Sequence, residues 1–136
     1  MTIFCDIDGV LRKYLYNWKE IKHSISYRDY IRLAEPIKEN IETIIDLSKN
    51  NEVMLATCCR YRLLNEIWME INGLQLPLIM TAKEKVEELA LQFEIKESCL
   101  IDDKPYHIEQ AEKYGMQGIY VPTNTIIKRE KIIKLL

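Results

Sequence analysis

Five short apolar runs, most of them separated by segments of helical period, constrain the fold of this chain more than any other feature of its sequence. The runs are rich in Val, Ile and Leu and scarcely alternate with polar residues, which is typical of strands buried on both faces. They span Thr2–Ile7, Glu52–Thr57, Leu76–Met80, Ser98–Ile101 and Gly118–Val121. We therefore expect a sheet that is covered on both sides.

The segments between the runs carry apolar residues at helical spacing. Pro36 suits the first turn of one expected helix, and Gly73 and Gly115 stand where two others end. A last short helix is expected over residues 126–136. Strands and helices that alternate in this way form parallel sheets through right-handed crossovers. The sequence predicts an α/β fold, a three-layer α/β/α Rossmann-like sandwich with a mainly parallel five-stranded sheet, in one domain of 136 residues.

Residues 12–35 do not fit this alternation. The segment combines many charges with aromatic residues and has no clean period. An insertion directly after the first strand would hang over the ends of the strands, so we interpret it as a small flap or cap. Its aromatic side chains could stack a nucleobase or sugar, or they could simply pack the flap onto the sheet. The sequence leaves both alternatives open.

Two carboxylates, Asp6 and Asp8, stand at the end of the first predicted strand, and Gly9 follows them. Alternate side chains of an extended chain point the same way, so both carboxylates can face one site. Two charges ~4 Å apart repel each other by about 4 kcal/mol at an effective dielectric of about 20. A proton or a hard divalent cation such as Mg²⁺ relieves this repulsion. The alternative is a strand end followed by an ordinary Asp-Gly turn.

A second acidic pair, Asp102 and Asp103, closes the fourth predicted strand. Ligands of such sheets bind at the carboxyl ends of the strands, so two acidic pairs there make a metal site far more probable than one. Thr57 ends the second strand with a hydroxyl that can donate to a phosphate oxygen. After the third strand, Lys83 and Lys85 offer a cation that could balance the carboxylates and an incoming phosphate.

The series DIDGVL, a strand that ends in Thr, a lysine, and IDD resembles the phosphatase branch of the haloacid dehalogenase superfamily. The segment DDKPYHIEQAEKYG is similar to the final loop and helix of that superfamily. The likeness covers the whole chain apart from the insertion and the last helix. It implies a hydrolase with a minimal cap, acting as a phosphatase on phosphoric monoesters. Because Asp8 is absent from members that cleave carbon–halogen bonds, its presence favours phosphate transfer.

The resemblance also implies catalytic roles. Asp6 would be the nucleophile and form an aspartyl-phosphate, and Asp8 would be the general acid and base. Thr57 would hold the phosphoryl group. Lys83 would neutralise the charge around the phosphate, and we prefer it to Lys85 because it stands three residues before Val86, as in the family pattern.

The resemblance implies a Mg²⁺ site as well. Its ligands would be Asp6, the backbone carbonyl of Asp8, and Asp102, with Asp103 as a further ligand or as a partner of one. The candidate substrate-binding residues are Thr57, Cys58, Arg60 and Lys83, with solvated surface as the alternative for Arg60. His23 and His107 are expected to be incidental.

Composition narrows the function classes. The net charge of −2 argues against bulk attraction to nucleic acid or to an anionic membrane, which makes nucleic acid an unfavoured partner. No apolar run approaches the roughly 20 residues that span a bilayer, and no signal peptide opens the chain, so we expect a cytoplasmic protein without a membrane partner. The four cysteines lack the spacing of a zinc site.

The expected substrate is a nucleotide or another small phosphorylated metabolite. The alternative is a non-catalytic regulatory module that keeps the fold and the metal site. The sequence predicts no oligomeric state.

Overall fold

The computed structural model describes residues 1–14, 26, 28–29, 31, 34–59 and 61–134. Within this part of the chain, five parallel strands form one sheet in the order β3-β2-β1-β4-β5. The strands are β1 (Thr2–Cys5), β2 (Glu52–Thr57), β3 (Leu78–Met80), β4 (Cys99–Asp102) and β5 (Gln117–Tyr120). The five predicted strands are confirmed. β3 begins after Pro77, which has no N–H to donate to a neighbouring strand.

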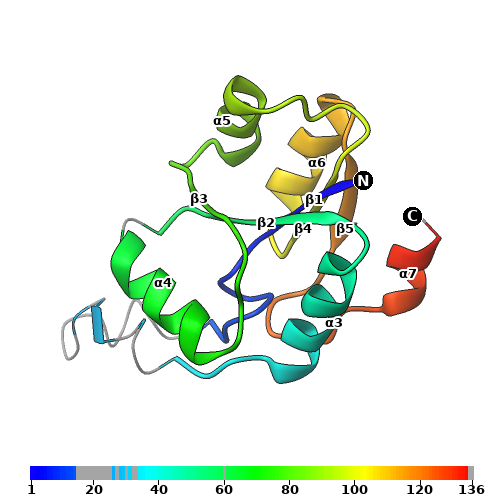
Figure 1. Ribbon diagram of the computed structural model, residues 1–136. Coiled ribbons are helices and arrows are strands. Elements are labelled where there is room, and N and C mark those ends of the chain that lie inside the picture. Colours follow the sequence, from blue (N-terminus) through cyan, green and yellow to red (C-terminus); the bar gives the residue numbers. More distant parts are fainter. Residues whose placement is uncertain (15–25, 27, 30, 32–33, 60, 135–136) are drawn as a thin grey trace.

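Helices cover both faces of the sheet (Figure 1). They are α3 (Lys38–Ser48), α4 (Arg62–Ile71), α5 (Lys85–Gln92), α6 (Pro105–Lys113) and α7 (Arg129–Ile133). Helices α3, α4 and α7 lie on one face, and α5 and α6 lie on the other. The predicted three-layer α/β/α architecture is therefore confirmed.

The two apolar cores follow from the alternation of side chains along β1. Ile3 and Cys5 pack into the core under α3, α4 and α7, whereas Phe4, between them, packs into the core under α5 and α6. All three side chains are fully buried. A strand buried on both faces has no polar alternation, which explains why these runs are continuously apolar in the sequence.

The strand order places a topological switch point between β1 and β4. The chain leaves β1 towards β2 and β3, and it returns to the other side of β1 when it enters β4. The loops that follow β1 and β4 therefore diverge and leave space at the carboxyl ends of these strands, where ligands of open α/β sheets bind. Asp6 and Asp102 both lie at this point.

Most of the predicted flap, residues 12–35, lies outside the described residues. Its two ends are described and lie side by side. The backbone N–H of Lys13 donates to the Glu35 carbonyl at 2.8 Å, and that of Ile37 donates to the Leu11 carbonyl at 2.7 Å. Among the described helices, none combines the length and the apolar character that a membrane crossing requires.

Candidate metal and phosphate site

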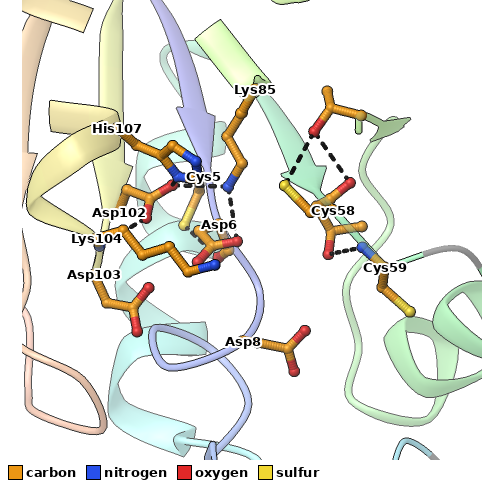
Figure 2. A network of polar contacts seen from close by, with 12 residues as sticks. Cys5, Asp6, Asp8, Cys58, Cys59, Lys85, Asp102, Asp103, Lys104 and His107 are labelled. Carbon is orange, nitrogen blue, oxygen red and sulfur yellow. Dashed lines mark hydrogen bonds and ion pairs between the residues drawn. The ribbon is translucent and has the colours of Figure 1, made fainter. Parts of the chain in front are cut away.

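A buried lysine joins the ends of β1 and β4. Nζ of Lys85 lies 2.9 Å from Oδ1 of Asp6 and 2.7 Å from Oδ2 of Asp102. Its side chain is 1% exposed. Figure 2 shows it reaching from α5 towards both carboxylates. Asp6 of the first acidic pair thus lies in one cluster with Asp102 and Asp103, the second pair, whereas the Asp8 carboxylate pairs with Arg12.

The lysine at the cluster is Lys85 and not Lys83, which is exposed. Our preference for Lys83 was therefore wrong as to position. α5 begins at Lys85, and helical side chains tilt towards the N-terminus, so the first residue of the helix points to the strand ends. The sequence held a usable signal, because Lys85 lies four residues before the buried Leu89 and so shares its face.

Asp102 is the best-supported carboxylate of the cluster. Besides Lys85, its Oδ1 accepts a hydrogen bond from the Lys104 backbone N–H at 2.9 Å, and Nδ1 of His107 lies 3.2 Å from its Oδ2. Burial opposes ionisation of Asp102, but the charge of Lys85 and the hydrogen bonds from His107 and Lys85 outweigh burial. The pKa of Asp102 is therefore well below its usual range.

His107 was expected to be incidental, yet it is buried and contacts Asp102. Pro105 opens α6 and is separated from the acidic pair by Lys104 alone, which places His107 in the first turn of that helix, close to the end of β4. His107 lies four residues before the buried Ala111, so helical spacing could have identified it as inward-facing.

The ionised form of Asp6 is less well stabilised than that of Asp102. Burial raises its pKa well above the ordinary value, and the negative charge of Asp102 raises it further, while Lys85 acts in the opposite direction. Burial likewise raises the pKa of Asp103. For both groups burial is the largest cause, because it disfavours the charged form of a carboxyl group.

The cluster suits a hard divalent cation. Oxygens of Asp6, Asp102 and Asp103 lie within 4.8 Å of one another. Oδ1 of Asp103 is buried and has no hydrogen-bond partner among the residues that the structure describes. Carboxylate oxygens are the ligands that Mg²⁺ prefers, and two positive charges would balance the excess of negative charge. The predicted metal ligands Asp6, Asp102 and Asp103 thus fit Mg²⁺.

Asp8 has surroundings of its own. Nε and Nη2 of Arg12 donate to its two carboxylate oxygens at 2.8 and 3.1 Å. The guanidinium group of Arg12 is fully buried and lies 5.0 Å from the centre of the Trp68 ring. Figure 2 shows the Asp8 carboxylate turned away from the cluster of Asp6 and Asp102. Sequence reasoning did not identify Arg12.

The side of the site formed by β2 carries neutral groups. The buried Thr57 accepts a hydrogen bond from the Cys59 backbone N–H at 3.2 Å through its hydroxyl oxygen. Cys58 is exposed, and its thiol donates to the Ala82 carbonyl at 3.1 Å. The third predicted substrate-binding residue of this segment, Arg60, lies outside the described residues.

Solved structures resemble this chain in fold. A chain of the Pnkp1/Rnl/Hen1 RNA repair complex matches 92% of this chain with 43% of its own length, at a TM-score of 0.67 and 15% identity. A haloacid dehalogenase-like hydrolase from Streptococcus pneumoniae matches 98% of this chain with 90% of its own length, at a TM-score of 0.62 and 16% identity. An enzyme of the same family from Bacteroides thetaiotaomicron, in complex with magnesium and inorganic phosphate, matches 91% of this chain with 95% of its own length. The TM-score is 0.61 and the identity is 12%.

This chain therefore spans less than half of the RNA repair chain and nearly all of the two hydrolases. No protein-family model and no curated protein sequence matches the chain. At these identities the likeness concerns the fold.

Proposed function

We propose that this chain, which has the fold of the haloacid dehalogenase-like hydrolases, is a Mg²⁺-dependent phosphohydrolase that cleaves phosphoric monoesters with Asp6 as its nucleophile. The observation that carries the proposal is the cluster of the buried Asp6, Asp102 and Lys85 with the half-buried Asp103 at the switch point of the sheet. A bound Mg²⁺ would offset the charge of the carboxylates and of the phosphate.

In the first step, an Asp6 oxygen attacks phosphorus and the bond to the leaving oxygen breaks. Oδ1 accepts a hydrogen bond from Lys85, so Oδ2 is the oxygen that we assign to the attack. Protonated Asp8 supplies the proton of the leaving alcohol. In this structure both Asp8 oxygens accept from Arg12, so this step requires the contact to loosen.

In the second step, water attacks phosphorus, Asp8 takes its proton, and the bond to Asp6 breaks, which restores the carboxylate. The Thr57 hydroxyl accepts from Cys59 and keeps its own proton for a phosphate oxygen. Lys85 takes the role that we had given to Lys83, because its charge lies against Asp6.

A substitution tests the proposal directly. Phosphate release from p-nitrophenyl phosphate and from a panel of phosphomonoesters is measured with Mg²⁺ and with EDTA. Asp6→Asn, which lacks a nucleophilic oxygen, should lower kcat about a thousandfold or more. The matched control is Asp46→Asn, an exposed aspartate paired with Lys49 and Arg129, which should retain wild-type activity. Turnover that survives in Asp6→Asn removes Asp6 from its role.

The panel also addresses the substrate. Nucleotides and small phosphorylated metabolites are the substrates that we propose, and 5′- and 3′-phosphorylated oligonucleotides belong in the panel because one similar chain comes from an RNA repair complex. The net charge of −2 disfavours nucleic acid. A preference for sugar phosphates over nucleotides would remove the nucleotide version. A wild-type chain that binds Mg²⁺ but hydrolyses no ester would instead favour a non-catalytic regulatory module.

A further inference from the structure

The Asp103 carboxylate is held in place through one of its oxygens. Oγ1 of Thr123 donates a hydrogen bond to Oδ2 of Asp103 at 2.8 Å. The same oxygen lies over Gly9, where a Cβ atom would collide with it. Gly9 also has a φ of +87°, which side chains rarely adopt. The turn after β1 and the loop after β5 therefore fix this carboxylate between them.

The other oxygen faces a different environment. Oδ1 of Asp103 is buried and makes no hydrogen bond within the described part of the chain. Asp103 belongs to the same group of carboxylates as Asp6 and Asp102. Because Thr123 already uses Oδ2, Oδ1 is the oxygen that remains for a cation. The orientation of the Asp103 carboxylate therefore decides which of its oxygens is presented to the cation.

The loop that carries Thr123 is itself anchored. The backbone N–H of Asn124 donates to the Gly9 carbonyl at 2.7 Å. The side chain of Asn124 pairs with the Tyr14 backbone, accepting from its N–H at 2.7 Å and donating to its carbonyl at 2.8 Å. Asn40 donates to the carbonyls of Thr125 and Val10 at 2.8 and 2.7 Å. The loop that carries the Thr123 hydroxyl is thus hydrogen-bonded to the turn after β1, the strand that precedes the proposed nucleophile Asp6.

We propose that Thr123 is a positioning residue that aims Oδ1 of Asp103 at the divalent cation, which makes Asp103 a direct ligand. The inference rests on the proposed function in that it places Mg²⁺ at this cluster. Hydrogen bonds that orient ligand side chains change metal affinity by about 10- to 100-fold, so an effect of that size is expected from a single hydroxyl.

The test measures binding of Mg²⁺ alone, and of Mn²⁺ alone, by calorimetry on the full chain at one pH and without substrate. Thr123→Val removes the hydroxyl and should weaken both dissociation constants about 10- to 100-fold. Thr123→Ser keeps the hydroxyl and should stay within about threefold of the wild type. Thr125→Val is the matched control, because its exposed hydroxyl contacts only the Pro122 carbonyl among the described residues. Thr123→Ala is measured alongside, so that a folded variant without the hydroxyl is available.

A double-mutant cycle separates positioning from a general loss of structure. In this proposal the effect of Thr123 on the cation passes through Asp103, so adding Thr123→Val to Asp103→Asn should weaken binding less than about threefold further. Additive losses would overturn the inference. So would wild-type affinity in Thr123→Val, loss of affinity in Thr123→Ser, or a wild-type chain that binds neither ion.

Failure of the proposed function gives a different result. In that case the wild-type chain binds Mg²⁺ more tightly than Thr123→Val does, yet releases phosphate from no ester. Unfolding curves in EDTA, which are expected to coincide for the wild type, Thr123→Ser and Thr125→Val, show that the affinities compare folded proteins.

Discussion

Asp6 and Asp8 are two residues apart in the sequence, yet their surroundings are opposite. Asp6 lies in a group of carboxylates with Asp102 and Asp103, and it shares the buried ammonium of Lys85 with Asp102. Asp8 accepts hydrogen bonds at both of its oxygens from Nε and Nη2 of Arg12. The first region is short of positive charge, and the second is balanced.

This difference shows how one short turn can serve two chemical purposes. A divalent cation gains most where negative charge is in excess, which is at Asp6 and not at Asp8. In the proposed mechanism Asp8 exchanges protons, a role best kept apart from that cation, and Arg12 binds the Asp8 carboxylate, which is turned away from the cluster (Figure 2). Substitutions at Lys85, Asp6, Arg12 and Trp68 test whether these two regions are as different as the structure indicates.

The largest effect is expected when the shared cation is removed. Lys85→Met leaves Asp6 and Asp102 buried without the ammonium group that they share, and it should lower the free energy of unfolding by about 3–5 kcal/mol in EDTA at neutral pH. Mg²⁺ should restore part of this loss, because it replaces the missing charge. Urea denaturation measures both values. Lys83→Met, at an exposed position, should change stability by less than about 0.5 kcal/mol. A stable Lys85→Met protein in EDTA would mean that the cluster carries little charge without metal.

The second-largest effect is expected in the pH dependence of stability, through the raised pKa of Asp6. Because its folded-state pKa is raised, the native state binds more protons than the unfolded state, and stability falls as pH rises from about 4 towards the folded pKa. Asp6→Asn removes this loss. In EDTA the variant should gain stability over the wild type with increasing pH, at no more than about 1.4 kcal/mol per pH unit. Urea denaturation between pH 4 and pH 8 measures the difference in free energy of unfolding between Asp6→Asn and the wild type. If this difference shrinks as pH rises, the raised pKa belongs to a group other than Asp6. Mg²⁺ should reverse the order by stabilising the wild type alone.

The balanced region should be less sensitive. Arg12→Gln leaves the Asp8 carboxylate unpaired, but this side chain is 22% exposed and water can solvate it in part. The expected loss is about 2 kcal/mol, with no recovery on addition of Mg²⁺. Arg12→Lys keeps the charge and loses the forked contact, so its free energy of unfolding should lie between those of the wild type and Arg12→Gln. Recovery of Arg12→Gln by Mg²⁺ would show that both regions share the cation.

The smallest effect concerns the ring above Arg12. Trp68→Phe keeps an aromatic face for the guanidinium but loses the hydrogen bond from Nε1 to the Ala34 carbonyl, which measures 3.1 Å. A loss of about 1 kcal/mol or less is expected in urea denaturation. Activity should stay close to that of the wild type. A large loss of activity would mean that Trp68 orients Asp8 through Arg12.

Sequence reasoning succeeded where a single local rule decides the result. Parallel strands with acidic carboxyl ends had to gather Asp6, Asp102 and Asp103 at one edge of the sheet. It failed for Lys83 because Lys85 is only two positions further along the chain, and the start of a helix is uncertain by that amount. It passed over His107 because contact with Asp102 depends on how α6 leaves β4.

By itself, the sequence determined the order of strands and helices, the layers, and the strand ends that carry carboxylates, because hydrophobic periodicity and turn residues act over a few neighbours. Only the tertiary structure decided how charge is divided. The pairing of Lys85 with two acids, of Arg12 with Asp8, and of Thr123 with Asp103 depends on where separate elements bring their side chains within a few ångströms. Electrostatic and hydrogen-bond energies change steeply over that range, so a shift of two residues in a helix start decides which lysine becomes part of the site.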